Sequence, residues 1–168
     1  MEDGPGRAIA VRPVGPNDAE AVVTLAWELL RYHAEISPWL APAPTIERFA
    51  DAWQPYFERF AGVDGRLALV AELDRRLAGY LLACLRDLPP ILEGPPELLV
   101  AEVMVVAEQR GRGVGRSLMG AAYEWGVRHG CQIARLHVYE PNEGAMGFYE
   151  REGFEVHERV MLKRIAGI

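Results

Sequence analysis

The sequence predicts a mixed α/β fold in one domain, and two observations support that prediction. The chain has 168 residues, half of them hydrophobic, which suits a single domain with its own core. Along the chain, the hydrophobic residues switch between the alternating spacing of strands and the three-to-four-residue spacing of helices. The predicted order is strand, two helices, three strands, helix, strand, helix, strand, which is typical of a sheet covered by helices.

The N-terminal part predicts a loose tail, a strand and a helix. Residues 1–7 hold two glycines and a proline, and the alternating run Ile9–Arg12 follows them. Asn17 stands three residues before Glu20, which is the spacing of a capping box at a helix start. Apolar side chains then recur at helical spacing until Ser37-Pro38, where the helix is expected to end because proline disfavours helical backbone in the residue before it.

A second helix and a hairpin are expected next. Thr45 is a suitable N-cap, and Pro55 inside the following helical pattern indicates a break, since proline lacks an amide hydrogen. Two strand-like runs, Leu67–Leu73 and Leu77–Leu85, flank a short polar turn. Four prolines between residues 87 and 97 predict a loop after the hairpin.

The C-terminal part alternates strands with helices. Gly130 follows a helical pattern and predicts a left-handed C-cap for it. The elements expected in this part are a strand at Leu98–Val106, a helix at Gly113–Arg128, a strand at Ile133–Val138, a helix at Asn142–Arg151 and a strand at Val156–Lys163.

Composition argues against several function classes. The formal net charge of −6 disfavours a nucleic-acid partner and fits a cationic substrate slightly better than an anionic one. Neither an apolar run long enough to span a membrane nor a signal peptide is visible, so a cytoplasmic protein without a membrane partner is expected. Cys84 and Cys131 do not form a C-x-x-C pair, and no metal site is predicted.

A glycine-rich turn lies between a predicted strand and a predicted helix. Glycine tolerates positive φ and close approach, so the backbone N–H groups of such a turn can converge on an anion. The following helix adds its free N–H groups and the positive end of its dipole. We therefore predict a phosphate or pyrophosphate site, the alternative being a turn that only joins two elements. This glycine turn consists of Arg110, Gly111, Arg112, Gly113, Val114, Gly115 and Arg116.

Two common nucleotide motifs do not match the glycine turn. A P-loop requires G-x-x-x-x-G-K-[ST], but Arg116 stands in the lysine position and Arg110 stands where the first glycine belongs. A dinucleotide fingerprint requires G-x-G-x-x-G, and its third glycine is missing whether the count starts at Gly111 or at Gly113. A phosphate-binding kinase or nucleotidase is therefore disfavoured.

Two motifs in the same order resemble the GCN5-related N-acetyltransferase (GNAT) superfamily. Its signature is a strand, then Q/R-x-x-G-x-G/A, then a helix, and residues 110–115 match every fixed position of that pattern. Further on, Asn142 followed by Phe148–Phe154 is similar to the family's second element, an asparagine and then F-Y-x-x-x-G-F. The resemblance is strong over residues 98–164, whereas over residues 8–97 only the order of elements agrees.

The resemblance implies a fold and a division of labour along the chain. The expected GNAT fold is a mixed central sheet of about six to seven strands with about four helices and a splayed pair of parallel strands. Residues 1–168 would form one N-acetyltransferase domain, in which residues 98–164 bind acetyl-CoA and residues 8–97 determine the substrate. Acetyl-CoA as the acetyl donor, an amine acceptor, no metal and a homodimer are further expectations from the family.

The resemblance also assigns site residues. The backbone groups of Val103, Met104 and Val105 would bind the pantetheine arm of the cofactor, and the glycine turn would bind its pyrophosphate. Asn142 would bond the pantetheine arm and can also be an N-cap, since the two roles are compatible. Tyr149 would protonate the departing thiolate, because a phenol is a weak acid, although an aromatic anchor for the helix is the alternative.

The attacking amine needs a group that accepts its proton. Glu102 is the first candidate because it is the only charged residue in the run Leu98–Val106, and burying a charge is costly. Its alternative is a side chain that faces solvent or forms a structural pair. His137 is the second candidate, and Glu72 and Glu140 are weaker ones.

Two functions from different classes remain open. The first is an N-acetyltransferase that moves the acetyl group of acetyl-CoA to a primary amine of an unidentified small molecule or peptide by direct attack. The second is a non-catalytic acyl-CoA-binding sensor on the same fold, although Tyr149 favours an enzyme. Aromatic side chains that suit a cationic acceptor, or that only pack in the core, are Tyr32, His33, Trp39, Trp53 and Tyr56.

Overall fold

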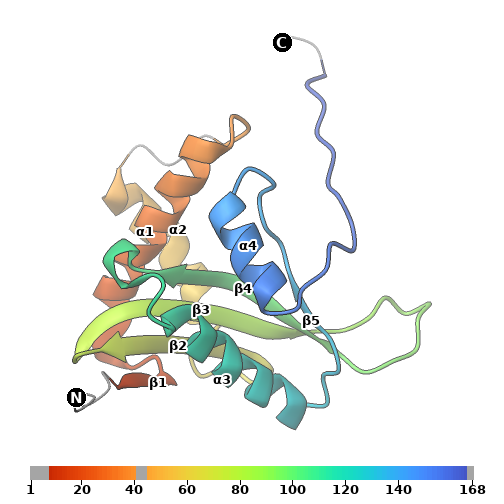
Figure 1. Cartoon of the computed structure of the whole chain (residues 1–168), viewed down its shortest axis with the longest axis horizontal. Coiled ribbons are helices and arrows are strands. Elements are labelled where there is room, and N and C mark those ends of the chain that lie inside the picture. Colours follow the sequence, from red (N-terminus) through yellow and green to blue (C-terminus); the bar gives the residue numbers. More distant parts are fainter. Residues whose placement is uncertain (1–7, 41–44, 166–168) are drawn as a thin grey trace, which may run out of the picture.

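A five-stranded mixed sheet forms the centre of the computed structural model, which describes residues 8–40 and 45–165 (Figure 1). Antiparallel pairing joins the first four strands, and the fifth strand pairs in parallel with the fourth. The predicted tail at residues 1–7 lies outside the described residues. The strands lie side by side in sequence order as β1 (Ile9–Pro13), β2 (Arg66–Leu73), β3 (Arg76–Arg86), β4 (Glu97–Val105) and β5 (Ala134–Leu136).

Within the described residues, four α-helices cover the two faces of this sheet, as the sequence predicts (Figure 1). One face packs against α1 and α2, and the other packs against α3 and α4. The helices are α1 (Ala19–Ile36), α2 (Ile46–Glu58), α3 (Val114–Arg128) and α4 (Glu143–Arg151), and two short 3-10 turns, η1 (Pro16–Asp18) and η2 (Ala107–Gln109), precede α1 and α3.

Alternation along the strands divides the core into two halves. Successive side chains of a strand point to opposite faces of the sheet. Leu81 of β3 therefore packs in the half that contains Leu118 of α3, whereas its neighbour Tyr80 packs in the half that contains Val22 of α1 and Trp53 of α2. Both strand residues are fully buried, so the central strands are apolar on both faces.

The second helix begins as predicted, but the break predicted inside it is absent. The Thr45 hydroxyl accepts a hydrogen bond from the backbone N–H of Arg48, as an N-cap should. The predicted break at Pro55 is wrong, because α2 continues through it to Glu58. Pro55 lies on the exposed side of the helix, where water can satisfy the carbonyl that loses its partner, and the buried face of the helix stays packed on the core.

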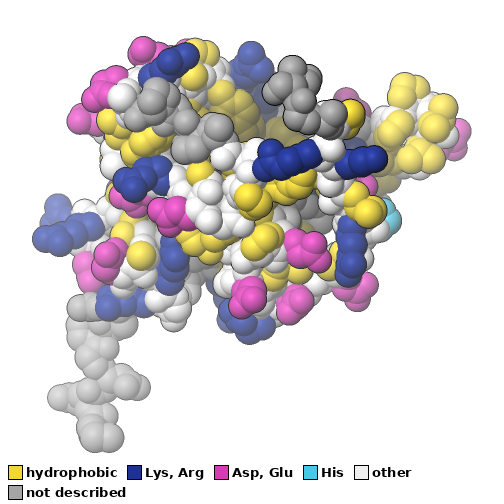
Figure 2. All heavy atoms as spheres, turned by 90° about the horizontal axis from the view of Figure 1, so that it is seen from above, with side chains coloured by type: hydrophobic (Ala, Val, Ile, Leu, Met, Phe, Trp, Pro, Cys, Tyr) yellow, Lys and Arg dark blue, Asp and Glu magenta, His cyan; other side chains and the backbone are white. Residues whose placement is uncertain are grey.

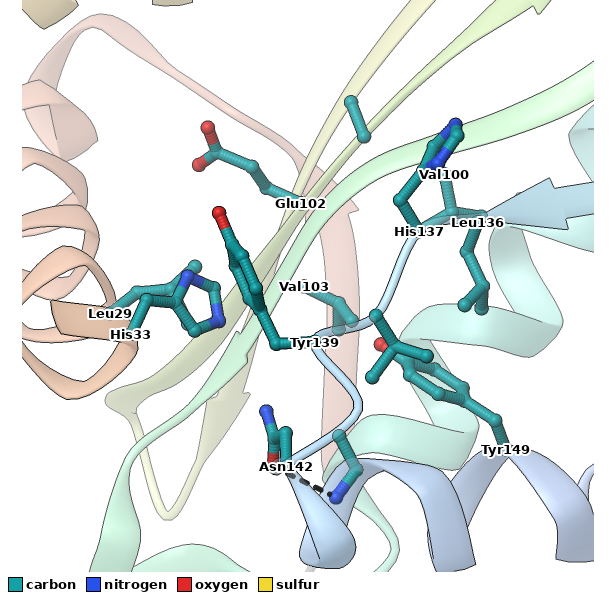
Figure 3. A pocket seen from close by; sticks show the side chains of 13 residues that line it. Leu29, His33, Val100, Glu102, Val103, Leu136, His137, Tyr139, Asn142 and Tyr149 are labelled. Carbon is teal, nitrogen blue, oxygen red and sulfur yellow. Dashed lines mark hydrogen bonds between the residues drawn. The ribbon is translucent and has the colours of Figure 1, made fainter. Parts of the chain in front are cut away.

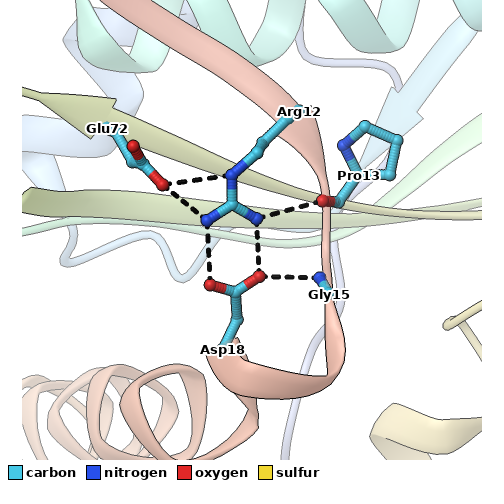
Figure 4. A network of polar contacts seen from close by, with 5 residues as sticks. All are labelled: Arg12, Pro13, Gly15, Asp18 and Glu72. Carbon is cyan, nitrogen blue, oxygen red and sulfur yellow. Dashed lines mark hydrogen bonds and ion pairs between the residues drawn. The ribbon is translucent and has the colours of Figure 1, made fainter. Parts of the chain in front are cut away.

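The capping box predicted at Asn17 is also wrong. The chain forms η1 over Pro16–Asp18, and α1 begins at Ala19. Asp18 instead accepts hydrogen bonds from the guanidinium of Arg12 and from the backbone N–H of Gly15 (Figure 4). Because Arg12 also pairs with Glu72 of β2, this network links β1, β2 and the start of α1.

The sheet is smaller than the six or seven strands implied by the resemblance. The strand predicted at Val156–Lys163 is an extended segment that forms no strand ladder with the described residues, and β5 is shorter than the predicted Ile133–Val138. A strand is defined by its hydrogen-bonded neighbour as well as by its sequence pattern, and the pattern alone cannot reveal whether that neighbour exists.

Candidate active site

A one-residue bulge in β4 shapes the centre of the site. Leu82 of β3 lies opposite Glu102, and the next residue, Ala83, lies opposite Val100, so Ala101 is the extra residue on β4. A bulge bends its strand and increases the local twist. The pairing of β4 with β5 ends at Val100 and Leu136, directly before the bulge, and the two parallel strands are unpaired beyond that point.

The bulge also decides which way the following backbone points. Val106 donates its N–H to Ala78, so its backbone faces β3. Because successive residues of a strand point their N–H and C=O groups to opposite sides, the backbone of Val105 and Val103 faces the opening beside β5. The backbone of Met104, which was predicted to bind the pantetheine arm together with Val103 and Val105, faces β3 instead.

A pocket occupies the opening between β4 and β5 (Figure 3). It passes through the sheet, since α1 contributes to one side of it and α4 to the other. Molecules that bind on opposite faces of the sheet can therefore meet inside it. Its lining consists of Leu29 and His33 of α1, residues 100–103 of β4, residues 136–139 at and after β5, and Asn142, Ala145 and Tyr149 around α4.

Glu102 directs its carboxylate toward the α1 and α2 side of the sheet. Without the bulge at Ala101, alternation would turn this side chain to the α3 side instead. The Tyr80 hydroxyl donates a hydrogen bond to the carboxylate over 2.6 Å, and the Trp53 indole N–H donates another over 3.4 Å. Burial raises the pKa of Glu102, and the two hydrogen bonds partly offset that rise.

Tyr149 stands on α4 and points its hydroxyl toward the pocket (Figure 3). Burial raises its pKa to about 12, with a smaller contribution from Tyr123 of α3. The phenol is therefore protonated at neutral pH and is available as a hydrogen-bond donor. Its ring also packs beside Phe148 and Phe154, so the anchoring alternative and the acid role are compatible.

Asn142 is both the N-cap of α4 and a wall of the pocket. Its side-chain oxygen accepts hydrogen bonds from the Ala145 backbone N–H over 3.1 Å and from the Tyr32 hydroxyl over 3.2 Å. Because both donors bind the oxygen, the amide nitrogen is the atom that faces the pocket, and it lies there in Figure 3. The side chain is held firmly, since the residue is only 8% exposed.

The glycine turn lies at the start of α3. Gly111 and Gly113 have φ values of 75° and 88°, so both need the left-handed backbone that glycine tolerates. Gly113 is the N-cap residue, and its carbonyl accepts the first helical hydrogen bond, from Ser117. The first N–H groups of α3 have no acceptor within the helix, which leaves them available to an anion. Gly115 instead allows close packing against Phe148.

The arginines of the glycine turn differ in what they contact. Arg110 donates from Nε to the carbonyl of Val105 over 3.1 Å, which ties the turn to the end of β4. Arg116 pairs with the mostly buried carboxylate of Glu152 after α4, at 2.9 Å. Arg112 is exposed beside the two positive-φ glycines. In this arrangement, the backbone N–H groups and the exposed guanidinium of Arg112 are the donors that the turn offers to an anion.

The other predicted bases are placed less favourably than Glu102. His137 lines the pocket but is exposed at its edge. Glu72 pairs with Arg12 in the network at the start of α1, so it does not contribute to the pocket lining (Figure 4). Glu140 is exposed and is likewise not part of that lining.

The predicted aromatic cluster divides between the pocket and the core. Trp53 packs in the core beside Glu102, and Trp39 is half exposed. His33 lines the pocket and packs on the ring of Tyr139, with 4.8 Å between the ring centroids, while burial lowers its pKa. Tyr139 was not predicted, although its place three residues before Asn142 puts it next to the family's second motif.

None of the described helices is both long enough and apolar enough to cross a membrane. Within residues 8–40 and 45–165, no group of three or more His, Cys, Asp or Glu side chains is arranged to hold a metal ion.

Comparison with known proteins places the chain among acetyltransferases. The model of the Acetyltransferase (GNAT) family matches residues 30–154. An uncharacterized N-acetyltransferase of Methanocaldococcus jannaschii is 33% identical over 115 residues, which are 66% of this chain and 50% of that protein. A mycothiol acetyltransferase of Tsukamurella paurometabola is 28% identical over 148 residues, or 86% of this chain and 47% of that protein. The chain thus spans about half the length of these relatives.

Solved structures agree in fold. An aminoglycoside N-acetyltransferase crystallised with CoA superposes with a TM-score of 0.73 at 21% identity, covering 98% of this chain and 99% of its own. The family match contains β2 to β5, the glycine turn and, apart from Leu29, every residue that lines the pocket. The chain therefore belongs to the acetyltransferase (GNAT) family.

Proposed function

We propose that this chain is an N-acetyltransferase that transfers the acetyl group of acetyl-CoA directly to a primary amine of a small molecule or peptide. The observation that supports this most is the pocket that passes through the sheet between β4 and β5. It brings Tyr149 on the α4 side and Glu102 on the α1 side to the same opening. Direct transfer needs such an opening, because donor and acceptor must touch each other.

The cofactor would bind on the side of α3 and α4. Its pyrophosphate would lie at the first N–H groups of α3, and its pantetheine arm would follow β4. There the arm would take the place of a neighbouring strand and bond the backbone of Val103 and Val105. The carbonyl of Val105 already accepts from Arg110, so its N–H is the group left for the arm. The amide nitrogen of Asn142 would donate to a carbonyl of the arm.

The acceptor would enter from the side of α1, between His33, Tyr139 and Glu102. In the proposed reaction, the amine nitrogen attacks the thioester carbon and the C–S bond then breaks. Glu102 accepts the proton that the amine loses, directly or through a water molecule. Its raised pKa makes it a better base than an exposed carboxylate. Tyr149 donates its proton to the departing thiolate.

Thiol release from acetyl-CoA across a panel of amines tests the proposed function. The panel should include polyamines, aminoglycosides, amino acids and short peptides, because the acceptors of relatives differ. We expect turnover with at least one amine by the wild type, and a loss of about 10²-fold in kcat for Tyr149→Phe. Acetyl-CoA binding without turnover against the whole panel would instead support the sensor alternative.

Tyr123→Phe is the matched control for this experiment. It also removes one phenol hydroxyl, from a tyrosine whose pKa burial raises to about 12, but Tyr123 stands on α3 and is not part of the pocket lining. We expect its kcat to stay within about twofold of the wild type. An equal loss in both variants, or no loss in Tyr149→Phe, would contradict the role given to Tyr149.

A further inference from the structure

Glu102 has a different environment from the charged side chains at the surface. Lys, Arg, Asp and Glu side chains are spread over the outside of the molecule, as Figure 2 shows for one face. Glu102 instead lies beside Tyr80 and Trp53 of the apolar core, and no basic side chain of the described residues pairs with it. Two neutral donors therefore stabilise the charge of this carboxylate.

The register of the sheet places Tyr80 beside Glu102. Leu82 lies directly opposite Glu102 in the pairing of β3 with β4. Tyr80 stands two residues before Leu82 on β3, and residues two apart on a strand share a face. Tyr80 is therefore the diagonal cross-strand neighbour of Glu102, at a separation that an aromatic side chain can bridge. The contact is built into the pairing of two central strands, together with the bulge at Ala101 that turns Glu102 to this face.

Packing fixes both donors before any substrate binds. Tyr80 is fully buried, and its pKa is raised well above the usual value by burial and by the charge of Glu102, so the phenol keeps the proton that it donates. The Trp53 indole stacks on Phe57 and Phe49, with 5.2 and 5.9 Å between ring centroids. It also meets the Tyr80 ring edge to face at 6.3 Å. Such a fixed second layer can orient a reacting side chain to within the narrow limits that proton transfer needs.

The two oxygens of Glu102 are held unequally. The Tyr80 hydroxyl is 2.6 Å from Oε2, a length typical of a hydrogen bond to a charged acceptor. The Trp53 indole nitrogen is 3.4 Å from Oε1, which is longer than most N–H···O bonds. A carboxylate offers about four lone-pair positions, so two donors leave about half of them free. Because Glu102 lines the pocket, this free acceptor capacity lies next to the path proposed for the amine.

We propose that Tyr80 is a positioning residue that fixes Oε2 of Glu102 and leaves Oε1 to accept the proton of the attacking amine. This inference rests on the proposed function, in which Glu102 is the base. The N–H bond of the amine breaks, its electron pair stays on nitrogen, and the proton forms an O–H bond with Oε1. The Tyr80 hydroxyl keeps its own proton and continues to donate to Oε2, so the protonated carboxyl group stays in place.

The indole N–H of Trp53 reports the ionisation of Glu102 without any substrate. NMR gives one indole N–H signal for each of the four tryptophans, and Trp53→Phe identifies the signal of position 53. Because this N–H donates to Glu102, its signal should move with pH in the wild type and should lose that step in Glu102→Gln. The variant keeps every other titratable group around the carboxylate, so the comparison isolates Glu102. Those groups are Tyr80 on β3, Tyr56 on α2, His33 on α1, His137 and Tyr139 after β5, and Tyr149 on α4.

Tyr80→Phe should raise the pH midpoint of this step by about one unit or more, because the ionised carboxylate loses its stronger donor. The acidic limb of the pH profile of kcat/KM should move by the same amount. Tyr56→Phe is the matched control, since the charge of Glu102 raises the pKa of Tyr56 but no hydrogen bond joins the two side chains. Its midpoint should stay at the value of the wild type. An unchanged midpoint in Tyr80→Phe, or an equal shift in both variants, would overturn the proposal.

Tyr80→3-fluorotyrosine provides a second test that does not depend on Tyr80→Phe remaining folded. The fluorine atom makes the phenol a stronger acid and therefore a stronger donor, while the hydroxyl stays in place. The midpoint should then move to lower pH, opposite to the shift in Tyr80→Phe. A shift to higher pH in both variants would show altered packing instead of donor strength and would contradict the role of Tyr80.

The activity of Glu102→Gln separates this inference from the proposed function. If this variant keeps the kcat of the wild type with an amine from the acceptor panel, Glu102 is not the base and both assignments are wrong. If it is inactive while Tyr80→Phe leaves the NMR midpoint unchanged, Glu102 stands as the base and only the positioning role of Tyr80 is refuted.

Discussion

Glu102 shows how one inserted residue places a charge. The side chain lies on the α1 and α2 side of the sheet only because the bulge at Ala101 shifts the alternation of β4 by one position. There it meets the donors Tyr80 and Trp53, which stabilise the carboxylate in an otherwise apolar environment. Burial nevertheless dominates, and the pKa of Glu102 is raised.

That raised pKa predicts a pH dependence of folding stability. Because the folded pKa lies above the unfolded one, protonated Glu102 contributes stability at low pH that is lost as the pH rises through the folded pKa. Glu102→Gln does not titrate, so its stability relative to the wild type should increase as the pH rises from acidic values through the raised pKa of Glu102. Each unit of pKa difference corresponds to about 1.4 kcal/mol. Urea unfolding of both proteins measures this, and a pH-independent difference would contradict it.

Tyr32 is expected to position Asn142 for the cofactor. Its hydroxyl is one of the two donors that fix the asparagine oxygen and turn the amide nitrogen to the pocket. Tyr32→Phe should therefore raise the KM for acetyl-CoA by about three- to tenfold, and kcat should change little, since one hydrogen bond contributes about 1 kcal/mol. In an Asn142→Ala background the same change should have no effect on KM. Equal effects in both backgrounds would refute the coupling.

Sequence alone identified many candidate residues but not their contacts. Asn142 and Tyr149 stand in a recognisable motif, and both line the pocket. Tyr32, Tyr80 and Trp53 bind those residues or Glu102 across 22 to 110 positions of sequence, and such separations leave no local pattern. The bulge at Ala101 was equally invisible, because it depends on the register between two strands.

At the scale of elements, the start of α3 joins the glycine turn to a helix dipole. Gly113 combines a positive φ with the N-cap position, and Gly111 repeats that backbone two residues earlier. Both glycines use the positive φ that glycine tolerates. Gly115 suits its position for a different reason, since a side chain there would press against Phe148 of α4.

Gly113→Glu should abolish acetyl-CoA binding. It would place a negative charge and a side chain beside the N–H groups that are proposed to bind the pyrophosphate, so we expect the Kd to rise at least about 10²-fold. Gly62→Glu is the matched control, because Gly62 also has positive φ but lies in the loop after α2; a Cβ would meet open space at Gly62 and only an ordinary contact with Ile9, at 3.5 Å, at Gly113. Calorimetric titration should show weakened binding only at position 113, while both variants lose similar thermal stability. Unchanged binding at position 113 would contradict the site.

Most elements follow from local signals, and the exceptions are instructive. The hairpin of β2 and β3, the four helices and the caps at Thr45, Gly113 and Gly130 all depend on nearby residues. The break predicted at Pro55 does not occur, because the exposed position of this residue lets water replace the lost hydrogen bond at little cost. The capping box predicted at Asn17 does not form, because Arg12 binds Asp18 and the chain enters α1 through the short turn η1 instead.

At the scale of the whole molecule, the separation of β4 from β5 beyond Val100 and Leu136 is the feature of the fold that creates the pocket. The opening lets the two faces of a three-layer protein share one pocket. The segment Val156–Lys163 was predicted as a strand, but it lacks among the described residues the neighbour that a strand needs.

The most direct test of the account is amide hydrogen exchange along β4 with and without acetyl-CoA, measured by NMR. We expect the amides of Val103 and Val105 to become protected on binding, because their N–H groups face the opening where the pantetheine arm would lie. Met104 faces β3 and should change little, so it serves as the internal control. Protection confined to Met104, or no change along β4 at saturating acetyl-CoA, would contradict a cofactor site between β4 and β5.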